Sequence, residues 1–273
     1  MNLKVLINPA EAEGHPWEMF FVGVVYALVS VWISKWLFSE YASIIMVAVT
    51  VVAALPIVYK IISFEARKDR DEQKEYNLLH EHEKAVKVLT FLFLGFVAGY
   101  TLWFVFPSQA TAQDLFSAQI NTILEINSPS ATGQFFKFGS ITDIFMNNVR
   151  ILAICIVLSL FFGAGALLVL SWNASVMATA IGTVIREKLA TSSTYFHIVS
   201  LSLVKYLLHG IPEITAYFGG ALAGGIVYHA VLKQRMDKHV MWDVTLLVFI
   251  SVVILFLATI LEVHLTPLVL RGF

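Results

Sequence analysis

Apolar stretches of about 20 residues follow one another along most of the chain and are separated by shorter polar segments. A helix rises about 1.5 Å per residue, so that about 20 apolar residues cover the roughly 30 Å hydrocarbon core of a bilayer. Each stretch of this length predicts a membrane-spanning helix. The six clear stretches are residues 17–38, 41–64, 85–106, 145–170, 211–232 and 242–265.

The composition agrees with this pattern. Of the 273 residues, 58% are hydrophobic and 14% are charged, and the mean hydropathy is +0.79. An ordinary soluble domain is about 45–50% apolar and about 25% charged. The net charge of −1 lacks the surplus of Lys and Arg that nucleic-acid binding requires. We predict an all-α, polytopic transmembrane helix bundle in the cell membrane, surrounded by lipid and without a nucleic-acid partner.

Positive charges predict the orientation, because Lys and Arg near span ends are retained on the cytoplasmic side. They are concentrated in residues 65–84 and 233–239, whereas residues 107–143 carry only Lys137. We therefore expect a cytoplasmic N-terminus and an external C-terminus. These assignments agree only if one further crossing lies between residues 173 and 210.

That region is long and polar for one simple helix. Residues 174–189 are interpreted as a re-entrant or interfacial helix, and residues 194–208 as a short helix that completes the crossing. The equal alternative is that residues 186–193 form a plain cytoplasmic loop. Unwound backbone inside a membrane must be satisfied by protein or water, so a broken segment predicts burial within the bundle. The expected total is six or seven spans, one of them broken or re-entrant.

The charged segment divides the chain into three parts. Residues 1–64 are expected to form an N-terminal transmembrane hairpin, residues 65–84 a charged cytoplasmic helix, and residues 85–273 the transmembrane core. Opposite charges four residues apart, such as Glu83 and Lys87, predict a solvated helix that a cytosolic partner can contact.

Small residues recur at four-residue spacing on several predicted spans, and this spacing lets helices approach closely in lipid. The stretch "ITAYFGGALAGG" has one face almost without side chains. Packing within the chain is the first interpretation, and a homodimer interface is the alternative. The predicted packing residues are Gly95, Gly99, Gly163, Gly165, Ala216, Gly220 and Gly224.

The stretch "LLHGIPEI" places polar residues between apolar ones. Glycine is favoured just past a helix, proline at the first helical position and an acid in the first turn. These preferences predict that one helix ends at Gly210 and that the next starts at Pro212. They do not require an ionisable group in the membrane, where a charge is expensive, so Glu213 is a candidate functional residue.

The stretch "MNNVRILAICIVLSLFFGAGALLVLSWNAS", followed by "LLHGIPEITAYFGGALAGG", resembles the stage II sporulation protein M family over residues 145–229. In that family a paired-asparagine helix leads through an Asn-Gly-like turn to a His-Gly-x-x-Glu helix start. Here the turn reads Asn173–Ala174, where glycine is common in the family. The resemblance implies a multi-pass membrane protein without established enzymatic chemistry. It also implies a shared polar core of Asn147, Asn148, His209 and Glu213.

The two parts of this core are expected at the outer side of the membrane, where an amide and a carboxylate satisfy each other. Arg150 follows Asn147 by three residues on the same helix face and is the expected counter-charge for Glu213. Glu262 is expected at the membrane interface. A polar cavity for an ion, a proton or a lipid head group is predicted around Asn147, Asn148, Arg150, Asn173, His209, Gly210 and Glu213.

No sequence motif supports catalysis, and neither a cofactor nor a metal site is expected. His80 and His82 lie two apart on a predicted helix, about 200° from each other, and cannot share one metal ion. Two functions remain. The first is a non-enzymatic scaffold that positions other membrane or envelope proteins, which the resemblance, the small-residue packing face and the charged cytoplasmic helix support. The alternative is a transporter or channel for a small ion, metabolite or lipid that passes His209 and Glu213.

Overall fold

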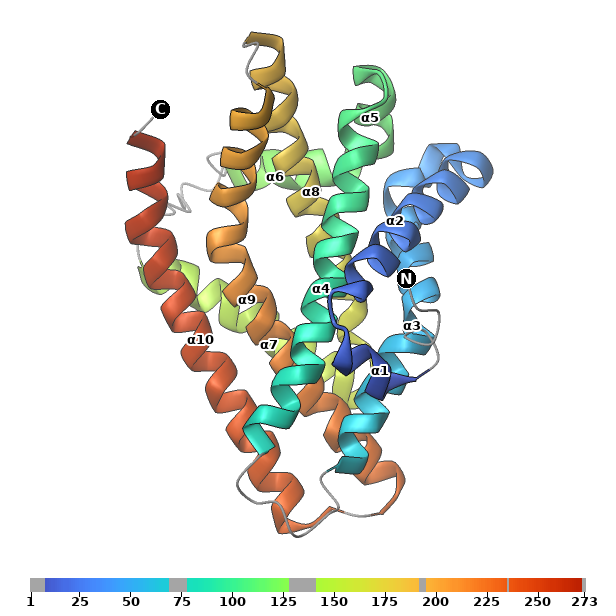
Figure 1. Cartoon of the computed structure of the whole chain (residues 1–273), viewed down its shortest axis with the longest axis vertical. Helices are drawn as coiled ribbons and strands as arrows, with labels where there is room; N and C mark the ends of the chain where they lie inside the picture. Colours follow the sequence, from blue (N-terminus) through green and yellow to red (C-terminus); the bar gives the residue numbers. More distant parts are fainter. Residues whose placement is uncertain (1–7, 69–77, 128–140, 192–194, 235, 272–273) are drawn as a thin grey trace.

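The computed structural model describes residues 8–68, 78–127, 141–191, 195–234 and 236–271. The described residues form helices and include no strand. Seven of these helices are long and apolar enough to cross a membrane, and they pack side by side in a bundle (Figure 1). The predicted all-α, polytopic bundle is confirmed, at the higher of the two expected span counts.

The long helices account for most of the described chain. They are α2 (Glu18–Leu37), α3 (Ala42–Lys68), α4 (Leu78–Val105), α7 (Ile141–Phe162), α8 (Ala166–Thr191), α9 (Tyr195–Leu232) and α10 (Lys238–Arg271). The short helices are α1 (Pro9–Gly14), the 3-10 helix η2 (Ser39–Tyr41), α5 (Gln109–Leu115) and α6 (Ser117–Asn127). We call the end of the bundle where α3 and α9 stop and α4 and α10 start the lower end, as it is drawn in Figure 1.

Helices α2 and α4 meet almost backbone to backbone. A Cβ atom added to Gly95 would lie 2.2 Å from the carbonyl oxygen of Phe20, and one added to Gly23 would lie 2.3 Å from that of Leu92. Gly99 lies against Ala27 one turn further along. The structure thus places the Gly95 and Gly99 pair in a close helix contact inside the chain.

The apolar run of residues 145–170 is two helices and not one span. The chain turns between α7 and α8 at Gly163, whose φ of +71° belongs to the left-handed region that glycine adopts without strain. The prediction of a single span here is wrong, because the turn itself is apolar and hydropathy does not register it. The additional crossing that the charges required is α8.

Helix α8 is continuous. The predicted re-entrant segment at residues 174–189 is therefore wrong, and so is the alternative loop at residues 186–193 as far as the structure describes it, to residue 191. The helix runs through Asn173, where a turn was expected, and continues to Thr191. Polar residues that suggested a break are packed within the bundle. Ser175 and Thr179 are buried, and the hydroxyl of Thr179 donates to the carbonyl oxygen of Ser175 at 2.8 Å.

Helix α9 is continuous as well, from Tyr195 to Leu232, with Pro212 inside it. The predicted helix end at Gly210 and helix start at Pro212 are wrong. Proline removes one backbone donor and crowds the carbonyl four residues earlier, but such residues are tolerated in membrane helices that neighbouring helices support. Gly210 is buried, and a Cβ atom there would lie 2.7 Å from the Met177 methyl group of α8.

The charged segment is less solvated at its ends than predicted. The Nδ1 atom of His82 on α4 and the Oε2 atom of Glu65 on α3 form a hydrogen bond of 2.9 Å, and both side chains are buried. The predicted ion pair between Glu83 and Lys87 is present at 2.5 Å. Residues 69–77 lie outside the described part of the chain. The Glu65–His82 pair joins α3 to α4 at the lower end.

At the upper end, the expected loop of residues 107–143 contains α5 and α6. Gln119 of α6 is buried, and its Nε2 atom donates to the carbonyl oxygen of Ser43 on α3 at 2.8 Å and to the Ser175 hydroxyl on α8 at 3.1 Å. This amide therefore ties α6 to two transmembrane helices.

Arg186 of α8 also reaches the upper end. Its Nε atom donates to the carbonyl oxygen of Phe104 at 2.8 Å, and its guanidinium group also donates to the carbonyl oxygen of Pro107. Phe104 lies in the last turn of α4 and Pro107 lies just after it, where a helix leaves acceptors unsatisfied and favours a positive charge. Arg186 therefore caps α4.

Candidate functional site

One face of α7 points into the bundle and carries Asn148. The buried residues of this helix are Ile144, Asn148, Leu152, Cys155 and Ser159, which recur every three to four residues as one face of a helix requires. Only 5% of the surface of Asn148 is exposed. The amide is therefore held among apolar neighbours and needs a hydrogen-bond partner.

Glu213 of α9 is that partner. The Nδ2 atom of Asn148 donates to the Oε1 atom of Glu213 at 2.5 Å. Glu213 is partly buried and lies near the start of the apolar part of α9, which begins at Gly210. The structure thus brings together two of the expected core residues, from positions 65 residues apart in the chain.

Asn147 and Arg150 are not part of this contact. Both are exposed and lie on the outward face of α7, whereas Asn148 lies on the inward face. A step of two residues turns a helix by about 200°, so Arg150 points away from the Asn148 side. The prediction that Asn147 and Arg150 line the polar core, with Arg150 as the counter-charge for Glu213, is corrected by this placement.

The remaining expected core residues lie on α8 and α9. Asn173 is partly buried within α8 and forms no turn. Gly210 is buried inside α9, one turn before Glu213. His209 lies on the described backbone of α9, but its side chain is outside the described part of the structure.

Glu262 is a residue of this region that the sequence reasoning assigned to the membrane interface. It lies on α10, within the candidate span Lys238–Val263, and it interacts electrostatically with Glu213. Both carboxyl groups also act on Tyr217, one turn after Glu213. The available signal was an acid within the apolar window of the last span, which marks a functional candidate.

The site therefore combines an amide from α7 with two carboxyl groups, one each from α9 and α10. The amide satisfies one carboxyl oxygen of Glu213, and the carboxyl group of Glu262 acts on Glu213 electrostatically. Such an arrangement can hold helices in register or can bind a proton or a small cation. The described residues contain no group of three or more His, Cys, Asp and Glu that could hold a metal ion.

The small-residue face of α9 lies beside this site and is used within the chain. A Cβ atom on Gly224 would lie 2.4 Å from the carbonyl oxygen of Ile156 on α7, and one on Gly225 would lie 2.7 Å from that of Gly163. Gly220 lies against Leu152 and Ile156 in the same way. A homodimer through this face would require α9 to leave α7.

These observations define a multi-pass membrane helix bundle with a polar contact between α7 and α9. The family model for stage II sporulation protein M matches residues 88–267 of the chain, from α4 to α10. The chain belongs to this family. The predicted resemblance over residues 145–229 is thereby confirmed and extended in both directions. No curated protein and no solved structure matches the chain.

Proposed function

We propose that the protein is a non-enzymatic membrane scaffold that positions other membrane or envelope proteins. The observation that carries this proposal is the Asn148–Glu213 bond between α7 and α9, two helices whose backbones touch at Gly224. A polar pair between tightly packed helices fixes their register more than it adds stability. A fixed register suits a platform, whereas alternating access requires helices to move.

The proposed orientation places the lower end of the bundle in the cytoplasm of the cell, with the N-terminus inside and the C-terminus outside. Lys233 and Lys238 are exposed at this end, and positive residues near span ends favour the cytoplasmic side. The upper end, with α5 and α6, then faces the outside and is the surface on which envelope proteins would assemble.

Site-specific photo-crosslinking in the native membrane tests the scaffold. A photo-reactive residue replaces Asp114, which is exposed on α5, and the matched control replaces Phe249, which is exposed on α10. We expect a discrete protein adduct from position 114 and lipid adducts from position 249. If position 114 yields only lipid adducts or links within the chain, the upper end is not a partner surface and the scaffold proposal fails.

The second candidate is a pathway for protons or small cations, and the observation that favours it is the pair of acids Glu213 and Glu262, which interact near the upper ends of two candidate spans. Ionisable groups inside a membrane are expensive and commonly mark transport pathways. The test is flux through purified protein in liposomes, with Glu213→Gln and Glu262→Gln as variants and Glu40→Gln as the matched control. If both core variants abolish the flux and the control retains it, the protein is a transporter and the scaffold proposal is rejected.

A further inference from the structure

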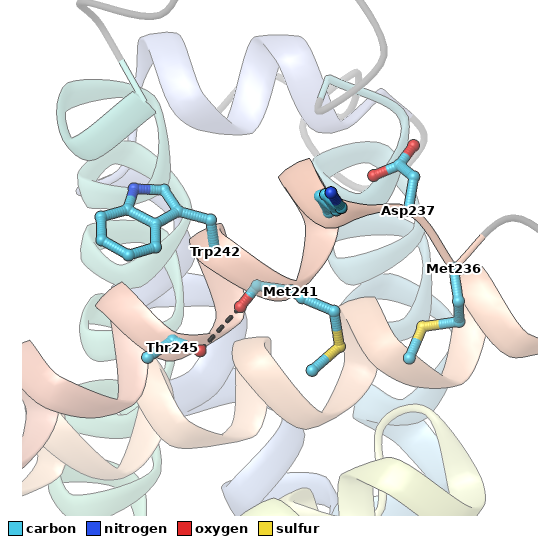
Figure 2. A pocket seen from close by; sticks show the side chains of 6 residues that line it. Met236, Asp237, Met241, Trp242 and Thr245 are labelled. Atoms are coloured by element: carbon cyan, nitrogen blue, oxygen red, sulfur yellow. Dashed lines mark hydrogen bonds between the residues drawn. The ribbon is translucent and has the colours of Figure 1, made fainter.

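The start of α10, just after the end of α9 at the lower end, carries a shallow and open hollow. Figure 2 shows the side chains around this hollow, which has a volume of about 580 Å³. The candidate spans of the two helices end at Leu232 and begin at Lys238, so the hollow lies at the boundary between membrane and water. Its lining residues are Met236, Asp237, Lys238, Met241, Trp242 and Thr245.

Beyond Met236, which precedes the charged pair, the lining changes from charged to apolar. Asp237 lies just before α10 and Lys238 begins it, Met241 and Trp242 lie one turn further into the span, and Thr245 follows after another turn. The Thr245 hydroxyl donates to the carbonyl oxygen of Met241 at 2.7 Å and is thus satisfied within the helix (Figure 2). The order from charged group to apolar group is the order that a phospholipid presents from its headgroup to its acyl chains.

The apolar part of the lining is exposed. Trp242 has 70% of its surface exposed, and Met236 and Met241 are exposed as well. A tryptophan with an apolar body and a polar N–H suits the headgroup level of a bilayer. Contiguous apolar exposure beside charged groups marks an interaction surface, and in this position the surface meets lipid.

The charged part of the lining offers one anion and one cation side by side. The Oδ1 atom of Asp237 accepts a hydrogen bond from the backbone N–H of Val240 at 2.9 Å, which holds the carboxylate at the start of α10. Lys238 is the next residue, and both side chains are exposed. A ligand that carries a phosphate and an amine a few ångströms apart complements this pair.

We propose that this hollow binds phosphatidylethanolamine. The phosphate pairs with the Lys238 ammonium group, and the primary amine donates to the Asp237 carboxylate in a charge-assisted hydrogen bond. A trimethylated choline headgroup has no N–H to donate. The glycerol headgroup of phosphatidylglycerol carries no positive charge, so its hydroxyl groups offer Asp237 only uncharged hydrogen bonds.

Native mass spectrometry tests the proposal on the full-length protein released from nanodiscs that contain equal parts of phosphatidylethanolamine, phosphatidylcholine and phosphatidylglycerol. We expect about threefold more retained phosphatidylethanolamine than phosphatidylcholine, the ratio that one exposed charge pair supplies. Equal retention of these two lipids, or a preference for phosphatidylglycerol, overturns the proposal.

Asp237→Asn isolates the charge, because asparagine caps a helix as well as aspartate does. We expect this variant to retain phosphatidylethanolamine and phosphatidylcholine equally, and a persistent preference contradicts the assigned pairing. Lys238→Gln should lower the retention of all three phospholipids. The unfolding temperature is measured in parallel, and Asp237→Ser serves as a second uncharged cap if Asp237→Asn unfolds early.

Trp242→Ala tests the apolar wall, and Trp36→Ala on α2 is its matched control, because Trp36 has 71% of its surface exposed. Retention of phosphatidylethanolamine should fall about threefold for Trp242→Ala and stay unchanged for Trp36→Ala. An equal loss in both variants would mean that tryptophans hold lipid nonspecifically, and the site would be rejected.

Discussion

Helices α9 and α10 are neighbours, yet they differ in both hydropathy and burial. The relation between these two properties is the reverse of that in a soluble protein. Within the span Gly210–Leu232 of α9, the apolar window has a mean hydropathy of 1.3 and 78% of it is buried. Within the span Lys238–Val263 of α10, the window has a mean hydropathy of 3.0 and 28% of it is buried. The less hydrophobic helix is inside. In a bilayer the surroundings are apolar, so hydropathy marks lipid exposure, and small size marks the interior.

The residues that produce this difference are plain in the sequence. The buried part of α9 carries an unusual number of glycines and alanines beside larger side chains such as Tyr217, Phe218 and Leu222, and each glycine lets a neighbouring backbone or side chain approach. The exposed positions of α10 carry large apolar side chains. They include Phe249, Val253, Phe256 and Leu257.

The largest effect is expected from Gly224→Val in α9. A Cβ atom there would lie 2.4 Å from the carbonyl oxygen of Ile156, and a backbone atom cannot move aside as a side chain can. We expect the free energy of unfolding to fall by about 3 kcal/mol or more. Thermal unfolding of the purified protein in mild detergent measures this loss.

Phe249→Leu in α10 is the control for that substitution, because Phe249 is exposed and its loss creates no cavity inside the bundle. Its effect should stay within about 0.5 kcal/mol. If both variants destabilise the protein equally, the contrast between the two helices does not reflect packing within the chain.

A smaller effect is expected where the two helices touch. A Cβ atom on Gly219 of α9 would lie 2.4 Å from the hydroxyl oxygen of Ser251 on α10, which is held by a bond to the carbonyl oxygen of Leu247. Gly219→Ala should lower the free energy of unfolding by about 1–2 kcal/mol. Ser251→Ala removes the obstructing oxygen, so the double variant should recover about 1 kcal/mol in a double-mutant cycle.

If Gly219→Ala and Ser251→Ala are additive, the two residues do not contact each other. The interface of α9 with α10 would then have to be redrawn. This cycle is more sensitive to the position of α10 than Gly224→Val, which reports on α7.

The smallest effect is expected at the polar contact. Asn148→Ala removes the donor to Glu213 and should cost about 0.6–1 kcal/mol, the usual contribution of a hydrogen bond in a membrane. Asn147→Ala is the matched control, since this neighbour is exposed and should change the free energy of unfolding by less than about 0.5 kcal/mol. A larger loss for Asn147→Ala would contradict the assigned inward face of α7.

The sequence predicted those parts of the fold that depend on hydropathy and charge. The class, the spans of the first hairpin and the need for one hidden crossing all follow from apolar length and from the distribution of Lys and Arg. The turn at Gly163 and the continuity of α9 through Pro212 do not. In the sequence, an apolar turn has the same pattern as the middle of a span, and a proline inside a helix has the same pattern as a proline at a helix start.

The candidate site divides in the same way. Glu213 was identified because an acid in an apolar stretch is unusual, and Asn148 because of the family resemblance. The choice between Asn148 and Asn147, and the exclusion of Arg150, depended on which face of α7 is inward. Small rotations of a helix decide that face, and the position of Glu262 beside Glu213 depends on how α10 leans on α9, which no local pattern records.

The turn between α7 and α8 also has a consequence for how the chain is made. It is only a few residues long, it is apolar, and it carries no charge that would hold it in water. Neither helix can be left outside while the other is threaded through, because the connection has no slack. We expect the two helices to enter the bilayer together as a hairpin during synthesis. Asn148 of α7 then lies in lipid without its Glu213 partner until α9 has been inserted.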